Sequence, residues 1–257
     1  MNKDFEKLYN FLKKNDDKKK IFITTSNRWD GDSQRPKSSM LADQLSELLN
    51  NVQIIDATKL NIYMCEGNVS NHEFNNCGVA EAILKGKPKN PHNFIRCWAS
   101  VNNPDDELYI IANAIYESDI VMFFGSIRWG KMNAVYAKLM ERLTWMENRH
   151  STLGESNLLK GKMAGVVATG HNWNGHNAVK LEKEILAFFG YETPKELFFN
   201  YQDISDMNDE TQEKYKMSYD DFIEEFSFLD MIKNDEIINF EKWVDKSYGE
   251  KEKSKKK

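Results

Sequence analysis

The sequence predicts a three-layer α/β fold, in which helices cover both faces of a five-stranded parallel sheet. Two patterns support this prediction. Short runs that are apolar throughout alternate with longer segments whose apolar residues recur every three or four positions. The short runs are typical of strands buried on both faces, and the periodic segments are typical of helices that pack on a sheet. Strands that alternate with helices are usually parallel, with right-handed crossovers.

The predicted elements follow this alternation along the chain. A short surface helix is expected first, over residues 3–15. The strands are expected at 21–25, 52–57, 119–126, 163–170 and 196–200. The helices between them are expected from Lys37 or Ser38, from Asn103, over 133–147 and over 175–189.

Local chemistry supports two of these helix boundaries. Asn103 is followed by Pro104 and two acidic residues. Asn is a good N-cap, Pro fits the first turn, and acids are stabilised at the positive end of the helix dipole. Gly190 is the expected C-terminal stop of the helix over 175–189.

We expect a single domain over residues 1–257, with its core at about 19–200. Segment 57–102 interrupts the alternation and is interpreted as an insertion. Apolar stripes within 201–248 predict one or two further helices, which would cover the core or a neighbouring subunit. The basic residues at 249–257 are expected to form a disordered tail.

Composition limits the classes of function. The formal net charge of −5 argues against a nucleic-acid partner. No apolar run approaches the roughly 20 residues that span a bilayer, and the N-terminus lacks the apolar core of a signal peptide. Three cysteines do not make a disulfide framework. These features indicate a cytoplasmic protein with no membrane partner.

The first loop of interest is TTSNRWDGDSQRPKSS, residues 24–39, between the first strand and its helix. Hydroxyl and guanidinium donors, together with the N–H groups of a helix start, favour a phosphate site. The candidate donors are Ser26, Arg28, Ser33 and Ser38. The loop is neither G-x-G-x-x-G nor a Walker A sequence. The alternative is a polar connection in which Ser38 is simply an N-cap.

Two more loops follow later strands. In 125–133, Arg128 and Trp129 stand beside Gly130, and an exposed aromatic there is a plausible lid for a flat ligand. The alternative is that Trp129 packs beneath the loop. Residues 168–177, ATGHNWNGHN, are dense in polar groups, but nothing completes a metal site. Ligands bind at the carboxyl ends of parallel strands. The three loops therefore suggest a ligand with a phosphate and a flat ring, such as a mononucleotide-like cofactor.

Three motifs carry a family resemblance. They are TSNR at 25–28 with KSSMLA at 37–42, the stretch 118–142 ending in Glu-Arg, and LKGKMAGVVATG at 159–170. Along about 19–200, the chain resembles the flavodoxin-like NAD(P)H-dependent FMN reductase and NAD(P)H quinone oxidoreductase superfamily. It departs from the family pattern at Thr25, where Gly is usual, at Ile127, where Pro is usual, and at Arg128, where an aromatic is common.

The resemblance implies a flavodoxin-like fold and an FMN site. Ser26, Arg28 and Ser38 would hold the phosphate, and Ser33 or Arg35 could fold back on it. The ring would lie along Ser126, Ile127, Arg128, Trp129 and Gly130. Its other side and the ribityl chain would meet Thr169, Gly170, His171 and Asn172. Hydride chemistry belongs to the flavin, so no catalytic side chain is expected.

The implied function is that of an FMN-containing oxidoreductase. It would take electrons from NADH or NADPH and pass them to a quinone, a nitro or azo compound, free flavin or a ferric complex. The alternative is a non-enzymatic flavodoxin-type carrier that docks on a protein partner. A third reading is a flavin-free structural subunit. The family commonly pairs subunits, so a homodimer or homotetramer is expected.

Related iron–sulfur flavoproteins carry a cysteine cluster after the second strand. Here Cys65, Cys77 and Cys97 are only three, and no C-x-x-C spacing occurs. A cubane cluster is therefore not expected. A metal site from Cys65, His72 and Cys77 is less favoured than ordinary buried or loop cysteines. Segment 60–100 is expected to form a wall of the substrate pocket or a dimer contact.

Overall fold

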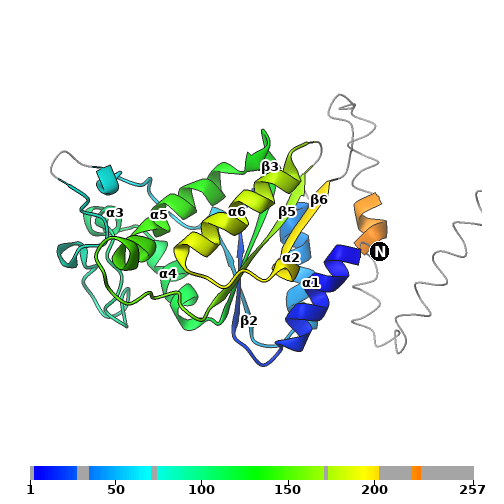
Figure 1. Cartoon of the computed structure of the whole chain (residues 1–257), viewed down its shortest axis with the longest axis horizontal. Coiled ribbons are helices and arrows are strands. Elements are labelled where there is room, and N and C mark those ends of the chain that lie inside the picture. Colours follow the sequence, from blue (N-terminus) through cyan, green and yellow to red (C-terminus); the bar gives the residue numbers. More distant parts are fainter. Residues whose placement is uncertain (1–2, 28–34, 71–73, 171–172, 203–220, 227–257) are drawn as a thin grey trace, which may run out of the picture.

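A parallel sheet runs through the middle of the molecule (Figure 1). The structure is a computed structural model and describes residues 3–27, 35–70, 74–170, 173–202 and 221–226. The parallel strands are β1 (Lys20–Thr24), β2 (Val52–Asp56), β3 (Ile120–Arg128), β5 (Met163–Gly170) and β6 (Phe198–Gln202). A short antiparallel strand, β4 (Lys131–Met132), pairs with the end of β3. The predicted α/β fold class is confirmed.

The strands are arranged in the order β2-β1-β3-β5-β6. With β4 set aside, this is the 2-1-3-4-5 order of flavodoxin-like sheets. The order reverses between β1 and β3, because β2 lies on one side of β1 and every later parallel strand lies on the other. The chain therefore leaves the carboxyl ends of β1 and β3 side by side. Ligands of doubly wound sheets bind at this point.

Helices cover both faces of the sheet, because successive strand residues point to opposite sides. On β3, Val121 and Phe123 belong to one apolar cluster, whereas Met122 and Phe124 belong to another. The first cluster lies under α4 (Leu108–Glu117), α5 (Ala134–Ser151) and α6 (Gly175–Phe189). The second lies under α1 (Lys3–Lys14) and α2 (Lys37–Leu48).

Part of the C-terminal extension also covers the second cluster. Residues 221–226 are helical, and both Phe222 and Phe226 are buried. The ring of Phe5 on α1 lies 4.9 Å from that of Phe226 and 5.1 Å from that of Phe199 on β6. The described part of the extension thus packs on the core. Residues 203–220 and 227–257, which include most of the predicted extension and the basic tail, lie outside the described residues.

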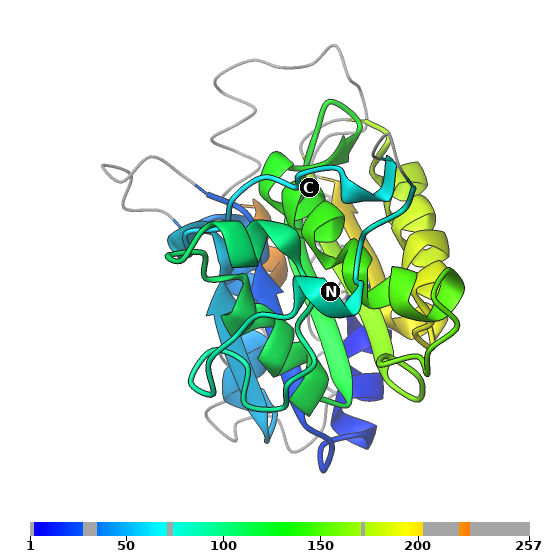
Figure 2. The same ribbon diagram turned by 90° about the vertical axis from the view of Figure 1, so that its left-hand side faces the viewer.

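Segment 57–102 occupies one end of the molecule, in front of the sheet in the view of Figure 2. Its regular elements are short. They are the 3₁₀ turns η1 (Ala57–Lys59), η2 (Asn68–Ser70) and η3 (Ala80–Ala82), and the helix α3 (Trp98–Asn102). A further 3₁₀ turn, η4 (Lys195–Leu197), precedes β6.

The predicted helix start at Asn103 is wrong. Asn103 is instead the C-cap residue of α3, and α4 begins at Leu108 after Glu107. The acidic residue that should face the helix dipole, Asp106, is buried and accepts hydrogen bonds from Arg142 on α5. This distant ion pair outcompetes the local capping pattern. Two other ends also differ from prediction, since α5 continues to Ser151 and β6 begins only at Phe198.

Candidate functional site

Two serines meet where β1 gives way to α2. Ser26 follows β1, and Ser38 lies in the first turn of α2. The Ser38 hydroxyl donates a hydrogen bond of 2.8 Å to Oγ of Ser26, and both side chains are buried. The N-cap position of α2 is held by Pro36, which offers no side-chain acceptor to the first turn. Unpaired N–H groups and the positive dipole end of a helix together favour an anion.

Thr24 adds an orphaned polar atom on the same side. It is the last residue of β1, and its Oγ1 is buried with no hydrogen-bond partner among the described residues. Residues two apart on a strand share a face, so Thr24 and Ser26 point toward α2. A buried hydroxyl without a partner is rare and is satisfied when an acceptor arrives. The chemistry of this corner therefore fits a phosphate group.

Asn133 connects the loop after β1 to the loop after β3 through hydrogen bonds. It caps α5 by accepting from the Tyr136 N–H, and its own N–H donates to the Ser126 carbonyl over 3.0 Å. Its amide Nδ2 also donates to Oγ1 of Thr25. Thr25 is fully buried and donates to the Phe124 carbonyl through both its N–H and its hydroxyl. Thr25 thus has hydrogen bonds of its own that a Gly at this position would lack in part, since a Gly has no hydroxyl.

The β3–β4 hairpin carries the most exposed aromatic side chain of the described residues. Ile127 pairs with Met132 and Arg128 with Lys131, so Trp129 and Gly130 form a two-residue turn. Both have left-handed backbones, with φ of 51° and 70°, as a type I′ turn requires. The turn directs Trp129 into solvent, where 90% of its surface is exposed. The alternative, in which Trp129 packs beneath the loop, is wrong.

The third loop lies against the second. Thr169 and Gly170 end β5, and Thr169 pairs with Ser126 across the sheet. A Cβ at Gly170 would lie 3.0 Å from the Cβ of Ile127, so Ile127 packs directly on that glycine and is buried. Asn174 holds the next contact, since its Nδ2 donates to the Gly130 carbonyl over 2.7 Å.

The structure therefore gathers the described candidates at one edge of the sheet. These are Ser26, Ser38, Ser126, Ile127, Arg128, Trp129, Gly130, Thr169 and Gly170. Arg28, Ser33, His171 and Asn172 lie outside the described residues. Arg35 forms an ion pair with Asp43 of α2 at 2.9 Å.

Sequence reasoning missed three contributors: Thr24, Asn174 and the bridging role of Asn133. Thr24 reads as part of an apolar strand, and Asn174 is one polar residue among many in its loop. The start of a helix at Asn133 is visible in the sequence as a capping residue, but its bond to a distant strand is not. Only the strand order, which places β1 beside β3, could have suggested that bond.

The cysteine segment makes no metal site in the described part of the chain. Cys65, Cys77 and Cys97 are free thiols. No three His, Cys, Asp or Glu side chains among the described residues are placed to hold a metal ion. His72 lies outside the described residues.

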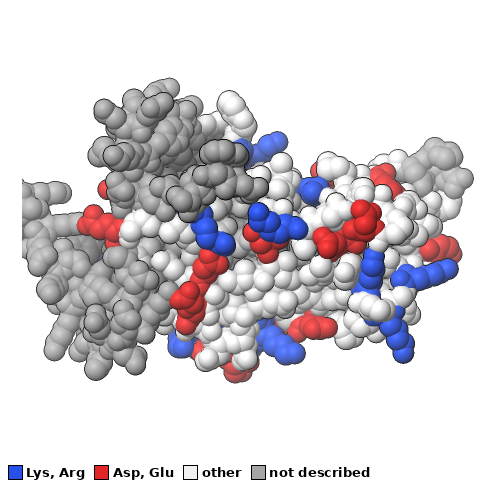
Figure 3. Space-filling view, turned by 180° about the vertical axis from the view of Figure 1, so that it is seen from behind, with Lys and Arg blue, Asp and Glu red and all other residues white. Residues whose placement is uncertain are grey.

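Two surface features bear on the class of partner. Within the described residues, no helix combines the length and the apolar character that a bilayer crossing needs. On the face drawn in Figure 3, Lys and Arg side chains lie among Asp and Glu side chains. A broad basic field is the electrostatic footprint of nucleic-acid binding. The visible part of that face carries mixed charge instead.

No protein-family model matches the chain, and no curated protein matches its sequence. Solved structures do match. One is RosB with a bound 8-demethyl-8-formylriboflavin-5′-phosphate intermediate, at 14% identity and a TM-score of 0.51, covering 91% of this chain and 87% of that one. An azoreductase from Bacillus anthracis str. Sterne matches at 14% identity and a TM-score of 0.47, covering 84% of this chain and 99% of that one. The apo form of the NADH:FMN oxidoreductase EmoB matches at 12% identity and 0.43, covering 79% and 88%. Likeness at such identity concerns the fold alone. The strand order and the match to RosB show that the chain has a flavodoxin-like fold.

Proposed function

We propose that the chain is an FMN-dependent oxidoreductase. It takes electrons from NADH or NADPH and passes them to a small acceptor, such as a quinone, a nitro or azo compound, free flavin or a ferric complex. One observation carries the proposal: the buried Ser26–Ser38 pair lies where the strand order reverses, at the start of α2, whose N-cap residue Pro36 makes no side-chain bond to the first turn. In a flavodoxin-like fold, this is where a ligand phosphate is expected.

The residues present fit a phosphate group. The hydroxyls of Ser26 and Ser38 now satisfy each other, and each can turn to donate to a phosphate oxygen. The Thr24 hydroxyl, which has no partner among the described residues, offers a third donor. RosB, the solved structure with the TM-score of 0.51, binds a flavin 5′-phosphate, and this supports the same class of ligand here.

The flat end of the cofactor would lie along residues 126–130 and the end of β5. Bound FMN supplies the hydride and electron chemistry, and the protein orients the ring and controls access to it. Ser126 and Thr169 pair with each other near the carboxyl ends of neighbouring strands, so their hydroxyls can address the polar edge of the ring. Ile127 supports this edge from beneath, because it is buried against Gly170.

The first test is whether the purified chain binds FMN. We expect flavin absorption bands and FMN in the supernatant after denaturation. The Ser38→Ala substitution should weaken the affinity for FMN about ten- to a hundredfold. This corresponds to the loss of about 1.5–3 kcal/mol for a hydrogen bond to a charged group. The affinity for riboflavin, which lacks the phosphate, should change little in this variant. Ser46→Ala is the matched control, since Ser46 lies on the same helix and donates to the Asp43 carbonyl of that helix. A protein that takes up no added FMN would refute the proposal.

A second measurement separates an enzyme from an electron carrier. We expect the FMN-loaded chain to oxidise NADH or NADPH in the presence of a quinone, with repeated turnover. A chain that binds FMN but does not turn over with either nicotinamide would support the carrier instead. The proposal also includes a single domain, a homodimer or homotetramer and a cytoplasmic location. Sedimentation of the FMN-loaded chain tests the assembly.

A further inference from the structure

All the cysteines of the chain border one small cavity in segment 57–102. The cavity has a volume of about 20 Å³, and its lining includes Cys65, Cys77, Cys97, Arg142 and Trp145. A space of this size holds about one water molecule, so an organic ligand does not fit. The described residues provide no metal site either. The remaining chemistry for such a cluster is between the thiols themselves.

Two side-chain contacts join the residues that flank Cys77 to the residues that flank Cys97. On one side of the pair, Nη1 of Arg96 donates to the carbonyl of Gly78 over 3.5 Å. On the other side, Nε1 of Trp98 donates to the carbonyl of Asn76 over 3.0 Å. The residues before and after Cys97 are thus bonded to the residues after and before Cys77. These two side-chain bonds therefore tie the two segments together on either side of the cysteines.

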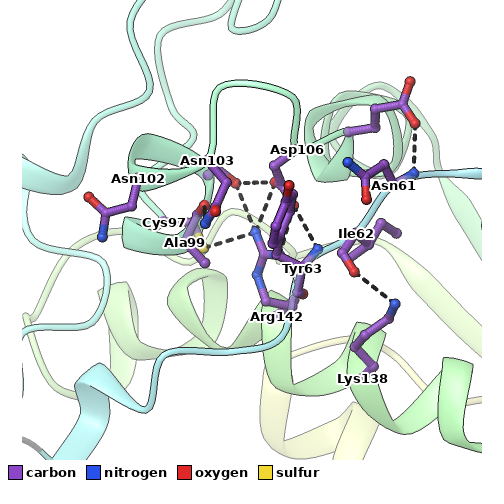
Figure 4. Close-up of polar contacts among 12 residues, drawn as sticks. Asn61, Ile62, Tyr63, Cys97, Ala99, Asn102, Asn103, Asp106, Lys138 and Arg142 are labelled. Atoms are coloured by element: carbon purple, nitrogen blue, oxygen red, sulfur yellow. Dashed lines mark hydrogen bonds and ion pairs between the residues drawn. The ribbon is translucent and has the colours of Figure 1, made fainter.

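Helix α5 anchors both cysteines. On one segment, Nδ2 of Asn148 donates to the Cys77 carbonyl over 2.6 Å, and a Cβ on Gly78 would lie only 2.9 Å from the Trp145 carbonyl. On the other segment, Nη2 of Arg142 lies 3.5 Å from Sγ of Cys97 (Figure 4). One helix therefore contacts both cysteine segments.

Cys65 differs from this pair. Its sulfur accepts from the N–H of Gly67, within its own turn. Cys77 and Cys97 both pack against the main apolar cluster. The Cys65 turn also reaches the Cys77 segment, because the Asn76 N–H donates to the Asn68 carbonyl over 2.8 Å. Cys65 is therefore the competing thiol against which the Cys77–Cys97 pair is tested.

We propose that Cys77 and Cys97 form a reversible disulfide, which makes this pair a thiol-oxidation site distinct from the cofactor edge. The oxidant is a small disulfide such as oxidised glutathione. The Cys97 sulfur attacks it, so that one glutathione leaves as its thiolate and a mixed disulfide forms. The Cys77 sulfur then attacks Sγ of Cys97 and releases the second glutathione. Two protein thiols are oxidised, and one glutathione disulfide is reduced to two glutathione molecules.

The order of attack follows from the surroundings of Cys77. Burial, with contributions from Cys97, Cys65 and Glu147, raises the pKa of the Cys77 thiol to about 12. A thiol attacks as its thiolate, so Cys77 is a poor first nucleophile. Ring closure by Cys77 is then the slow step, and its rate should rise about tenfold per pH unit between pH 7 and 9, as the thiolate fraction rises.

The test uses the full chain, treated with oxidised glutathione and then blocked with N-ethylmaleimide. Thiols counted after denaturation should fall from three to one, since the chain has three cysteines. Mass spectrometry of a non-reduced digest should find a Cys77–Cys97 peptide pair. The disulfide should also raise the thermal unfolding midpoint above that of the dithiothreitol-reduced protein. None of these readouts depends on flavin binding.

Two variants sharpen the result. Cys65→Ser should form the same disulfide at the same rate, and its thiol count should fall from two to none. Cys77→Ser should stop at the mixed disulfide on Cys97. A cross-linked pair that contains Cys65 would overturn the proposal. So would wild-type protein that keeps three thiols, or that carries glutathione without ever closing the internal bond.

Discussion

Asn133 and Thr25 lie 108 positions apart, yet the amide Nδ2 of Asn133 donates to the Thr25 hydroxyl over 3.1 Å. Asn133 begins α5, and Thr25 follows β1. The bond therefore links the loop that would hold a phosphate to the loop that would hold a ring. The distance between these two loops sets the length of ligand that the edge of the sheet accepts.

Asn133→Ala should destabilise the protein and loosen both loops. Loss of the cap costs about 0.5–2 kcal/mol, and the lost bond to Thr25 about 0.5–1.5 kcal/mol. Urea unfolding measures the sum. Asn133→Asp is the informative control, because its carboxylate still accepts from the Tyr136 N–H but has no N–H for Thr25. Its loss should be smaller than that of Asn133→Ala, and an Asn133→Asp variant as stable as the wild type would show that the bond to Thr25 contributes nothing.

Arg142→Met should cost about 3–5 kcal/mol, because it leaves a buried carboxylate without its partner. The side chains of Arg142 and Asp106 are both fully buried and joined at 2.9 Å. The double variant Arg142→Met with Asp106→Leu should recover much of this loss, since apolar replacements of buried pairs are often tolerated. Lys7→Met breaks the exposed pair with Asp4 and should leave stability almost unchanged, because surface ion pairs contribute little. Denaturant unfolding compares all of these variants.

Glu182→Gln should remove a pH dependence of stability. Burial raises the pKa of the Glu182 carboxyl, although the 2.8 Å bond from the Tyr136 hydroxyl partly opposes this. The folded state therefore favours the protonated form. The resulting stabilisation is complete below the unfolded pKa of about 4.3 and is lost as the pH rises through the higher folded pKa.

Thermal midpoints of wild type and Glu182→Gln should thus diverge from pH 4 toward neutrality, with the variant more stable at pH 7. Glu184→Gln is the matched control on the exposed side of the same helix, and it should follow the wild type. Parallel curves for wild type and Glu182→Gln would contradict the buried-acid account.

Phe226→Ala tests whether residues 221–226 belong to the core. Phe226 is buried against Phe5, Phe199 and Tyr201, and removal of a buried Phe side chain costs about 3–5 kcal/mol. Ile223→Ala, on the exposed side of the same short helix, should stay within about 0.5 kcal/mol of wild type. Urea unfolding distinguishes the two variants. A near-neutral Phe226→Ala would mean that this segment does not dock in solution.

The sheet could be predicted from the sequence because its strands are buried on both faces. A run such as Ile21-Phe22-Ile23 predicts a buried strand without knowledge of which strands lie beside it. The same local reasoning fails at Asn103, where every capping residue is in place but no helix begins. Asp106 instead accepts hydrogen bonds from the guanidinium of Arg142, 36 positions away. A local sequence pattern cannot reveal such a distant partner.

The candidate site divides in the same way. Ser26 and Ser38 could be predicted to lie together because they stand at the two ends of one loop, after a strand end and at a helix start. The contact of Ile127 with Gly170, and that of Asn174 with Gly130, depend on which strands are neighbours in the sheet. The exposure of Trp129 depends on a type I′ turn. The sequence Trp-Gly does not predict this turn, since such turns favour Asn-Gly or Asp-Gly.

The turn at Trp129 and Gly130 lowers stability without a gain in folding. A bulky L-residue with left-handed backbone costs roughly 1–2 kcal/mol, and Asn or Gly would fit the same turn with less strain. Trp129 also gains little from burial, because its ring is out in the water. Folding therefore gives no reason for an indole at this position. Sequences selected for stability alone should lose it, and those selected for activity at the sheet edge should keep it.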